Sequence, residues 1–146
     1  NNNNKDIESA TLILRFKDLK NLQKSLNDYT KEQVYECCYC YKSLSSRRTI
    51  KEHLLIETDI FPENQRIPLS MFPTQLEANN VKYALYGVIE YISEHYISHI
   101  RRSDERWETH NDLQKKIKVS TSNCLNASPH LAVHTQIQPT SILTRI

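Results

Sequence analysis

A histidine and an aspartate in the C-terminal half of the chain have the residue types for acid–base chemistry. His95 opens one predicted strand, and Asp112 follows the next. Because adjacent strands bring such positions together, we expect the imidazole and the carboxylate to lie close to each other. A carboxylate beside an imidazole fixes its tautomer and stabilises the imidazolium, as in the base-and-acid half of a Cys–His or Ser–His catalytic set. The spacing is equally compatible with a strand histidine that has no catalytic role.

Cysteines form the second group that could do chemistry. Cys37, Cys38 and Cys40 are crowded together, and Cys124 is remote. This is a poor framework for disulfides, so we expect a reducing compartment, the cytoplasm or the nucleus. None of the three clustered cysteines follows an asparagine-bearing turn or opens an apolar-periodic helix that would lower its pKa. We therefore predict no nucleophile among them.

The same cluster has the spacing of metal ligands. Cys37 and Cys40 form a Cys-x-x-Cys pair, and with His53 they match the spacing of a two-Cys two-His zinc finger over residues 35–58. A structural zinc ion has four ligands, and the window for the fourth holds Glu57 instead of a histidine. Carboxylates do bind zinc, though fingers rarely use one. A plain turn with reduced cysteines is the competing interpretation.

Strands must position the histidine and the aspartate. Residues 83–91, 95–100 and 106–110 are rich in aromatic and β-branched side chains and predict three strands. The joins at 92–94 and 103–105 are short enough for hairpins. The sequence therefore predicts an antiparallel meander.

A helix and two further strands are predicted around this meander. Asp18 is placed to cap a helix whose apolar residues recur at spacings of three, four and three. These residues are Leu19, Leu22, Leu26 and Tyr29. Leu12, Leu14 and Phe16 predict a short strand before the helix, and residues 130–136 predict a last strand. Together the elements indicate an α+β fold with an N-terminal helix.

Composition bounds the organisation and the partners. The chain has 146 residues, 38% of them hydrophobic, which fits one domain. We expect a disordered polar tail at 1–10, a domain at 11–137 and a second tail at 138–146. A net charge of +2 gives no electrostatic case for nucleic acid or a membrane surface, and no apolar run is long enough for a membrane helix. The single glycine, Gly87, excludes glycine-rich phosphate loops.

The run from 71 to 136 resembles the C-terminal half of the catalytic domain of ubiquitin-specific proteases, the ubiquitin carboxyl-terminal hydrolases. Residues 72–76 are similar to the family's Phe-Pro-x-x-Leu entry, and 83–89 to its Tyr-x-Leu-x-x-Val-x strand. His95-Tyr96 matches the His-Tyr of the Gly-His-Tyr box. Trp107 followed by Asn111-Asp112 resembles the element that supplies the triad acid, and 19–40 resembles the family's helix and Cys-x-x-Cys segment.

The resemblance implies part of a papain-like cysteine peptidase fold. It assigns His95 as general base, Asp112 as the residue that orients it, and Asn111 as a neighbouring polar group. The implied reaction is hydrolysis of the bond after the C-terminal glycine of ubiquitin, so the implied partner is ubiquitin or a ubiquitinated protein. No cofactor is required for it, and zinc would be structural.

Departures from the family pattern point to a chain that is silent by itself. Nothing in residues 1–36 resembles the Gly-Asn-x-Cys-Tyr-x-Asn box of the nucleophile. Glu94 stands where the family has a glycine, and Ser98-His99 replaces a small-aromatic pair. A long hydrophobic strand before Phe72 is missing or shortened. Because loss of a nucleophile costs on the order of 10⁶-fold in turnover, we expect an inactive fragment of a deubiquitinase. The alternative is a non-enzymatic binding module: a ubiquitin-binding pseudo-protease or a degenerate zinc finger at 35–58.

Overall fold

The structure, a computed structural model, describes residues 13–15, 19–58, 65–121 and 125–137. The predicted tails at 1–10 and 138–146, and Cys124, lie outside these residues. So do Leu12, Phe16 and the predicted helix cap Asp18. Within the described part, no helix is long and apolar enough to cross a membrane.

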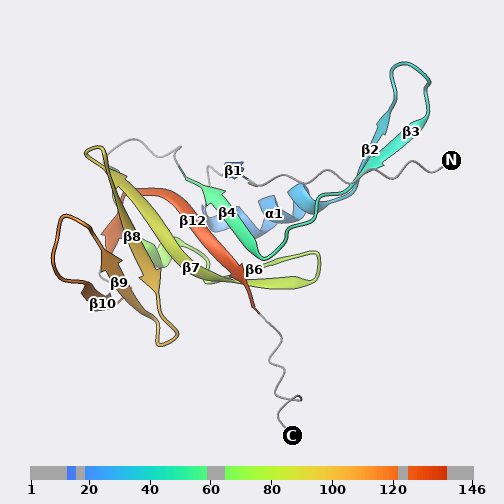
Figure 1. Cartoon of the computed structure of the whole chain (residues 1–146). Helices are drawn as coiled ribbons and strands as arrows, with labels where there is room; N and C mark the ends of the chain where they lie inside the picture. Colours follow the sequence, from blue (N-terminus) through green and yellow to red (C-terminus); the bar gives the residue numbers. More distant parts are fainter. Residues whose placement is uncertain (1–12, 16–18, 59–64, 122–124, 138–146) are drawn as a thin grey trace, which may run out of the picture.

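One large, twisted sheet organises the molecule (Figure 1). Its strands lie in the order β1 (Ile13–Arg15), β4 (His53–Glu57), β12 (Pro129–Gln136), β7 (Val81–Ile92), β8 (His95–Arg101), β9 (Arg106–His110) and β10 (Lys118–Thr121), and β6 (Gln75–Ala78) also pairs with β7. Only the β1–β4 pair is parallel among these described strands. The predicted architecture, a mostly antiparallel sheet with one short helix, is confirmed.

Tight turns set the register of β7, β8 and β9. Ser93 and Glu94 connect β7 to β8 with φ angles of 50° and 59°, so Ile92 pairs with His95. Two consecutive left-handed residues are the signature of a type I′ hairpin turn, whose twist matches that of the strands. At the next turn, the Arg102 N–H donates to the Arg106 carbonyl over 2.8 Å. Each turn therefore fixes which side chains of the neighbouring strands face each other.

The chain's one glycine lies where β7 and β8 touch. A Cβ added at Gly87 would come within 2.7 Å of the His99 carbonyl oxygen and 3.6 Å of the Ile100 Cα. Side chains essentially never approach a backbone oxygen that closely. Only glycine therefore allows the present spacing of the two strands at this point.

A short helix packs its apolar stripe against the sheet. The 3₁₀ turn η1 (Leu19–Asn21) leads into α1 (Leu22–Thr30). Leu19, Leu22 and Leu26 are buried, as their helical spacing requires. The Gln23 side chain clamps β6 by accepting the Glu77 N–H over 2.9 Å and donating to the Glu77 carbonyl over 2.8 Å.

Large side chains of the sheet fill the core. Trp107, Tyr83 and Phe72 are each no more than 2% exposed. Burying one such side chain contributes roughly 1.5–3 kcal/mol. The Tyr83 hydroxyl lies within hydrogen-bond distance of the backbone carbonyls of Ile50 and Lys51, which ties the segment before β4 to β7. The edges of the core are closed by the two-residue strands β5 (Ile67–Pro68) and β11 (Asn126–Ala127) and the 3₁₀ turn η2 (Leu69–Met71).

Strand β4 occupies the place where the sequence suggested a missing or shortened strand. It is five residues long and lies between β1 and β12, with Leu54 and Ile56 fully buried. Its run of three adjacent apolar residues hides the period-two alternation that identifies a strand. The strand is nevertheless an interior strand of the sheet, paired on both sides by β1 and β12.

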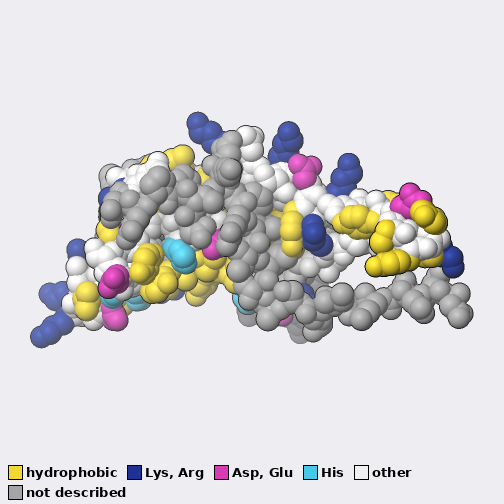
Figure 2. Space-filling model, turned by 90° about the horizontal axis from the view of Figure 1, so that it is seen from above, with side chains coloured by type: hydrophobic (Ala, Val, Ile, Leu, Met, Phe, Trp, Pro, Cys, Tyr) yellow, Lys and Arg dark blue, Asp and Glu magenta, His cyan; other side chains and the backbone are white. Residues whose placement is uncertain are grey.

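A two-stranded hairpin, here called the cysteine arm (residues 33–46), extends away from the sheet (Figure 1). It consists of β2 (Gln33–Glu36) and β3 (Ser43–Ser46), which pair with each other in a separate sheet. Figure 2 shows hydrophobic side chains gathered at this end of the molecule. The exposed ones are Val34, Tyr35, Tyr39, Tyr41 and Leu44.

Candidate functional site

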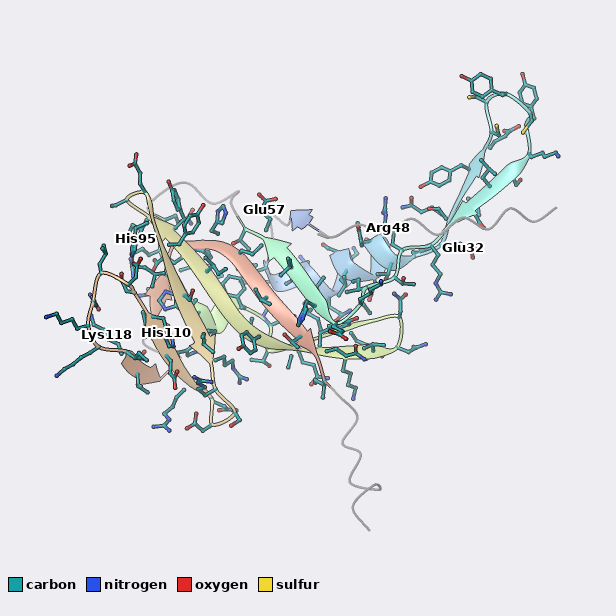
Figure 3. All side chains as sticks on the ribbon, viewed as in Figure 1. Glu32, Arg48, Glu57, His95, His110 and Lys118 are labelled. Atoms are coloured by element: carbon teal, nitrogen blue, oxygen red, sulfur yellow. The ribbon has the colours of Figure 1, made fainter. Side chains whose placement is uncertain are left out.

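The predicted His–Asp pair does lie together. The turn at Ser93-Glu94 places His95 at the start of β8, and Asn111 and Asp112 follow the end of β9. The Nε2 of His95 is 2.7 Å from Asn111 Oδ1 and 3.0 Å from Asp112 Oδ1. The His95 side chain is 21% exposed and that of Asp112 82%. Figure 3 shows His95 at the end of the large sheet.

These contacts fix the tautomer of the His95 ring. Amide and carboxylate oxygens only accept hydrogen bonds, so Nε2 carries the proton and donates it. In the neutral ring Nδ1 is then the basic nitrogen. Asn111 is itself held in place, because its Oδ1 also accepts the Leu113 N–H over 3.0 Å. The arrangement is an oriented imidazole, a candidate general base, with no cysteine beside it in the described residues.

A hollow of about 540 Å³ adjoins this pair, with Asn111 in its wall. Its apolar side is formed by Ile92, Ile97 and Leu125, and polar side chains line the rest. Asn111 links the hollow to the candidate base, because its Oδ1 is 2.7 Å from His95 Nε2; His95 itself does not line the hollow.

A second histidine–carboxylate pair, which the sequence analysis missed, lies at the floor of this hollow. Glu90 of β7 and His99 of β8 are 2% and 3% exposed, with His99 Nε2 and Glu90 Oε1 3.0 Å apart. The Nδ1 of His99 is 2.9 Å from Thr109 Oγ1 on β9. Glu90 Oε2 accepts the Ser128 N–H over 2.6 Å and is 3.4 Å from Arg66 Nη1. The network joins β7, β8, β9 and the entry to β12.

The charge on Glu90 is stabilised by its partners. Burial raises the pKa of Glu90, but the hydrogen bonds from His99 and the Ser128 N–H and the nearby charges of His99 and Arg66 outweigh burial, so its pKa lies below the usual value. Glu90 therefore stays ionised in the folded protein at neutral pH. The only sign of this pair in the sequence is a glutamate, Glu90, inside the otherwise apolar predicted strand 83–91. His99 stands out only as a departure from the family pattern.

His134 on β12 is fully buried and neutral. Its Nε2 donates to the Pro73 carbonyl over 2.9 Å. Burial lowers the pKa of His134 to about 4, and the hydrogen bond to Pro73 only partly offsets this. His134 thus connects the loop before β6 to the sheet. Its Nδ1 has no hydrogen-bond partner in the described chain, so a proton added there would find no acceptor.

The candidate metal ligands do not form one site. Cys37 and Cys40 lie at the tip of the cysteine arm, whereas His53 begins β4 and pairs with Thr135 of β12. Across residues 13–15, 19–58, 65–121 and 125–137, no group of three His, Cys, Asp or Glu side chains gathers around a common point. The finger spacing fails because the chain between the cysteines and His53 returns into the sheet. These residues therefore do not complete a zinc site within one chain.

No protein-family model matches the sequence, and no curated protein matches it. The fold, however, is similar to that in solved structures of the SAGA DUB module, which contains Ubp8, Sgf11, Sus1 and Sgf73. Comparison with the module bound to monoubiquitin gives a TM-score of 0.54 at 19% sequence identity, over 86% of this chain. Comparison with the module bound to ubiquitin aldehyde gives a TM-score of 0.53 at 19% identity, also over 86% of this chain. A structure of the yeast module gives 0.53 at 20% identity over 86%.

These likenesses show the fold. The chain spans 35% of the length of each of these three matched chains. The fold of this chain is therefore similar to that of about one third of a chain in the SAGA DUB module.

Proposed function

We propose that this chain is the C-terminal half of a ubiquitin-specific protease domain and holds the general base and the acid of its active site. The observation that carries the proposal is the placement of His95 Nε2 at 2.7 Å from Asn111 Oδ1 and 3.0 Å from Asp112 Oδ1. The fold likeness to the SAGA DUB module and the sequence resemblance around the histidine support it. Ubiquitin, named in two of those structures, is the proposed partner.

In the proposed reaction, His95 acts through Nδ1. The ring takes the proton from a cysteine thiol, and the thiolate attacks the carbonyl carbon of the bond after the ubiquitin C-terminal glycine. The imidazolium returns the proton to the leaving amine as the carbon–nitrogen bond breaks, and water then hydrolyses the thioester. Asp112 and Asn111 hold the ring and stabilise its charged form.

The thiol must come from another polypeptide segment. Cys37, Cys38 and Cys40 lie on the cysteine arm, at the opposite end of the molecule from His95 (Figure 3). Cys124 lies outside the described residues and after the acid, in the wrong order for the family. Without a nucleophile, this chain by itself is proposed to be catalytically silent. The same observation favours a second candidate function, a ubiquitin-binding pseudo-protease.

Ubiquitin binding and turnover by the purified chain test the proposal. We expect saturable binding to immobilised ubiquitin and no hydrolysis of a ubiquitin-linked fluorogenic substrate. Failure to bind ubiquitin would contradict both candidate functions. Hydrolysis that His95→Ala abolishes, and that the matched control His53→Ala retains, would contradict the proposed silence while supporting His95 as the base.

A further inference from the structure

The tip of the cysteine arm is a single turn that brings Cys37 and Cys40 together. The Tyr41 N–H donates to the Cys37 carbonyl over 2.9 Å, which is the hydrogen bond of one helical turn. Within such a turn, residues three apart lie on the same side, with about 5–6 Å between their Cβ atoms. Tyr41 takes a left-handed φ of 58°, and the Cys37 N–H donates to the Lys42 carbonyl over 2.9 Å, so the chain returns directly into β3. The backbone therefore holds the two thiols side by side.

The two sulfur atoms lie within hydrogen-bond reach of each other. The backbone N–H groups of Cys40 and Tyr39 donate to the Cys37 sulfur, and so does the Cys40 thiol. Because these donors stabilise the thiolate, the pKa of Cys37 lies below its usual value. Cys37 is partly exposed and Cys40 exposed, so a reagent can reach both sulfur atoms. Figure 3 shows the sulfur atoms of the arm at its tip, clear of the main body of the described chain.

This arrangement suits thiol–disulfide exchange. A reactive dithiol needs one thiolate that attacks and a second thiol close enough to resolve the mixed disulfide that results. Cys37 has the stabilised thiolate, and Cys40 is the thiol in contact with it. Cys38 is exposed as well, but neighbouring residues in a helical turn do not face each other. Cys40, rather than Cys38, is therefore the partner of Cys37.

We propose that Cys37 and Cys40 form a redox-active dithiol, which closes into an intrachain disulfide by exchange with a small disulfide such as glutathione disulfide. The Cys37 thiolate attacks one sulfur of the small disulfide, and the other sulfur leaves as a thiolate. The Cys40 thiol gives up its proton, and its sulfur then attacks the Cys37 sulfur of the mixed disulfide and releases the second thiolate. Two protein thiols are thus oxidised, and one disulfide is reduced to two thiols. An added dithiol reverses the steps.

Such a bond is a reversible modification of the arm. The three cysteines that the structure describes are free thiols, so the arm is seen here in its reduced state. Transient disulfides of this kind occur in cytosolic proteins, where they are catalytic or redox-sensing. The bond would close a ring around the turn that presents Tyr39 and Tyr41, which are 92% and 75% exposed. The proposal is independent of His95 and of any activity on ubiquitin.

Oxidation of the purified chain with glutathione disulfide, after treatment with EDTA, tests the proposal. Free thiols are then trapped by alkylation, and the cysteine-bearing peptides are analysed by mass spectrometry. We expect a monomer in which Cys37 and Cys40 are joined to each other, whereas Cys38 and Cys124 remain free thiols. Dithiothreitol should restore all four thiols.

Single variants separate the roles of the cysteines. Cys40→Ser should stop at the mixed disulfide, with one glutathione on Cys37, and this adduct should form several-fold faster than any adduct on Cys37→Ser. The matched controls Cys38→Ser and Cys124→Ser should close the disulfide as the wild type does, and far-UV circular dichroism should show that all variants fold alike.

Three results would overturn the proposal. The first is the absence of a bond between Cys37 and Cys40 in the oxidised chain. The second is a bond that joins two chains or that uses Cys38 or Cys124. The third is equal rates of adduct formation on Cys40→Ser and Cys37→Ser, since Cys37 would then not be the attacking thiol.

Discussion

Two histidines a few residues apart on β8 differ in what their surroundings allow. His95 is partly exposed, and its hydrogen bonds leave Nδ1 as the basic nitrogen. Both nitrogens of His99 are engaged inside the protein, by Glu90 and Thr109. Of these two rings, only His95 therefore has the free ring nitrogen that the proposed function requires, although both rings face a carboxylate.

His134 should make stability depend on pH. Its pKa is about 4 when folded and 6.5 in the unfolded chain, so the unfolded state binds more protons between these values. The stabilisation from keeping the ring neutral is complete above pH 6.5 and is lost as the pH falls towards 4. The free energy of unfolding should fall by up to about 1.4 kcal/mol per pH unit in that window.

Urea unfolding at several pH values, on the wild type and His134→Leu, measures this contribution. The variant removes the His134 ring and leaves every other histidine in place, so the difference between the two proteins reports on His134 alone. We expect the pH dependence of the variant to be shallower by about one proton. The variant should also be less stable by about 1–3 kcal/mol at neutral pH, because the Pro73 carbonyl loses its donor. If the free energy of unfolding depended on pH equally in the wild type and the variant, His134 would not be buried in its neutral form.

At the scale of elements, the Glu90–His99 pair holds β7, β8 and β9 together. Because both side chains are buried, removing one partner leaves the other unsatisfied, which typically costs 3–5 kcal/mol. We expect Glu90→Gln and His99→Gln each to destabilise the protein by about this amount. The double variant should cost much less than the sum, since the interaction is lost only once.

An exposed pair on the same sheet supplies the control for this cycle. Arg102, in the turn just after β8, and Glu108 of β9 form an ion pair at the surface, with Nη2 and Oε2 2.6 Å apart. Their coupling, measured by the same urea unfolding, should be far weaker because solvent screens it. Coupling energies of similar size for the two pairs would contradict the importance assigned to burial.

The turn before His95 carries strain that a substitution should relieve. Glu94 has a φ of 59°, a region that a glycine adopts freely and other residues adopt at a cost of about 1 kcal/mol or more. Glu94→Gly should therefore stabilise the protein by about 0.5–1 kcal/mol in urea unfolding. Ser103→Gly, at a turn position without a left-handed φ, should be neutral or destabilising. A loss of stability in Glu94→Gly would rule out the type I′ turn.

Much of the sheet could be predicted from residue types. Aromatic and β-branched residues predict β7, β8 and β9, and the lengths of their turns predict that His95 meets Asp112. The cysteine arm could not be predicted, because its strands are largely polar and exposed and lack a buried face. The Glu90–His99 pair was missed because no periodic signal reveals that two polar side chains in neighbouring strands share the same buried face.

At the scale of the whole molecule, His95 and the cysteine arm lie at opposite ends (Figure 3). The candidate base belongs to β8 of the large sheet, and the three cysteines that the structure describes belong to the separate two-stranded sheet of the arm. The proposed thiol therefore cannot come from the arm as it is placed here.

Gly87 gives this layout a further consequence. At that position the main chains of β7 and β8 lie so close that no side-chain atom fits between them. Strand β8 carries both His95 and His99. A methyl group added at Gly87 would push β8 away from β7. Both the partly exposed His95 and the buried His99 would then be displaced. The placement of the candidate base His95 therefore depends on the absence of a Cβ atom at Gly87.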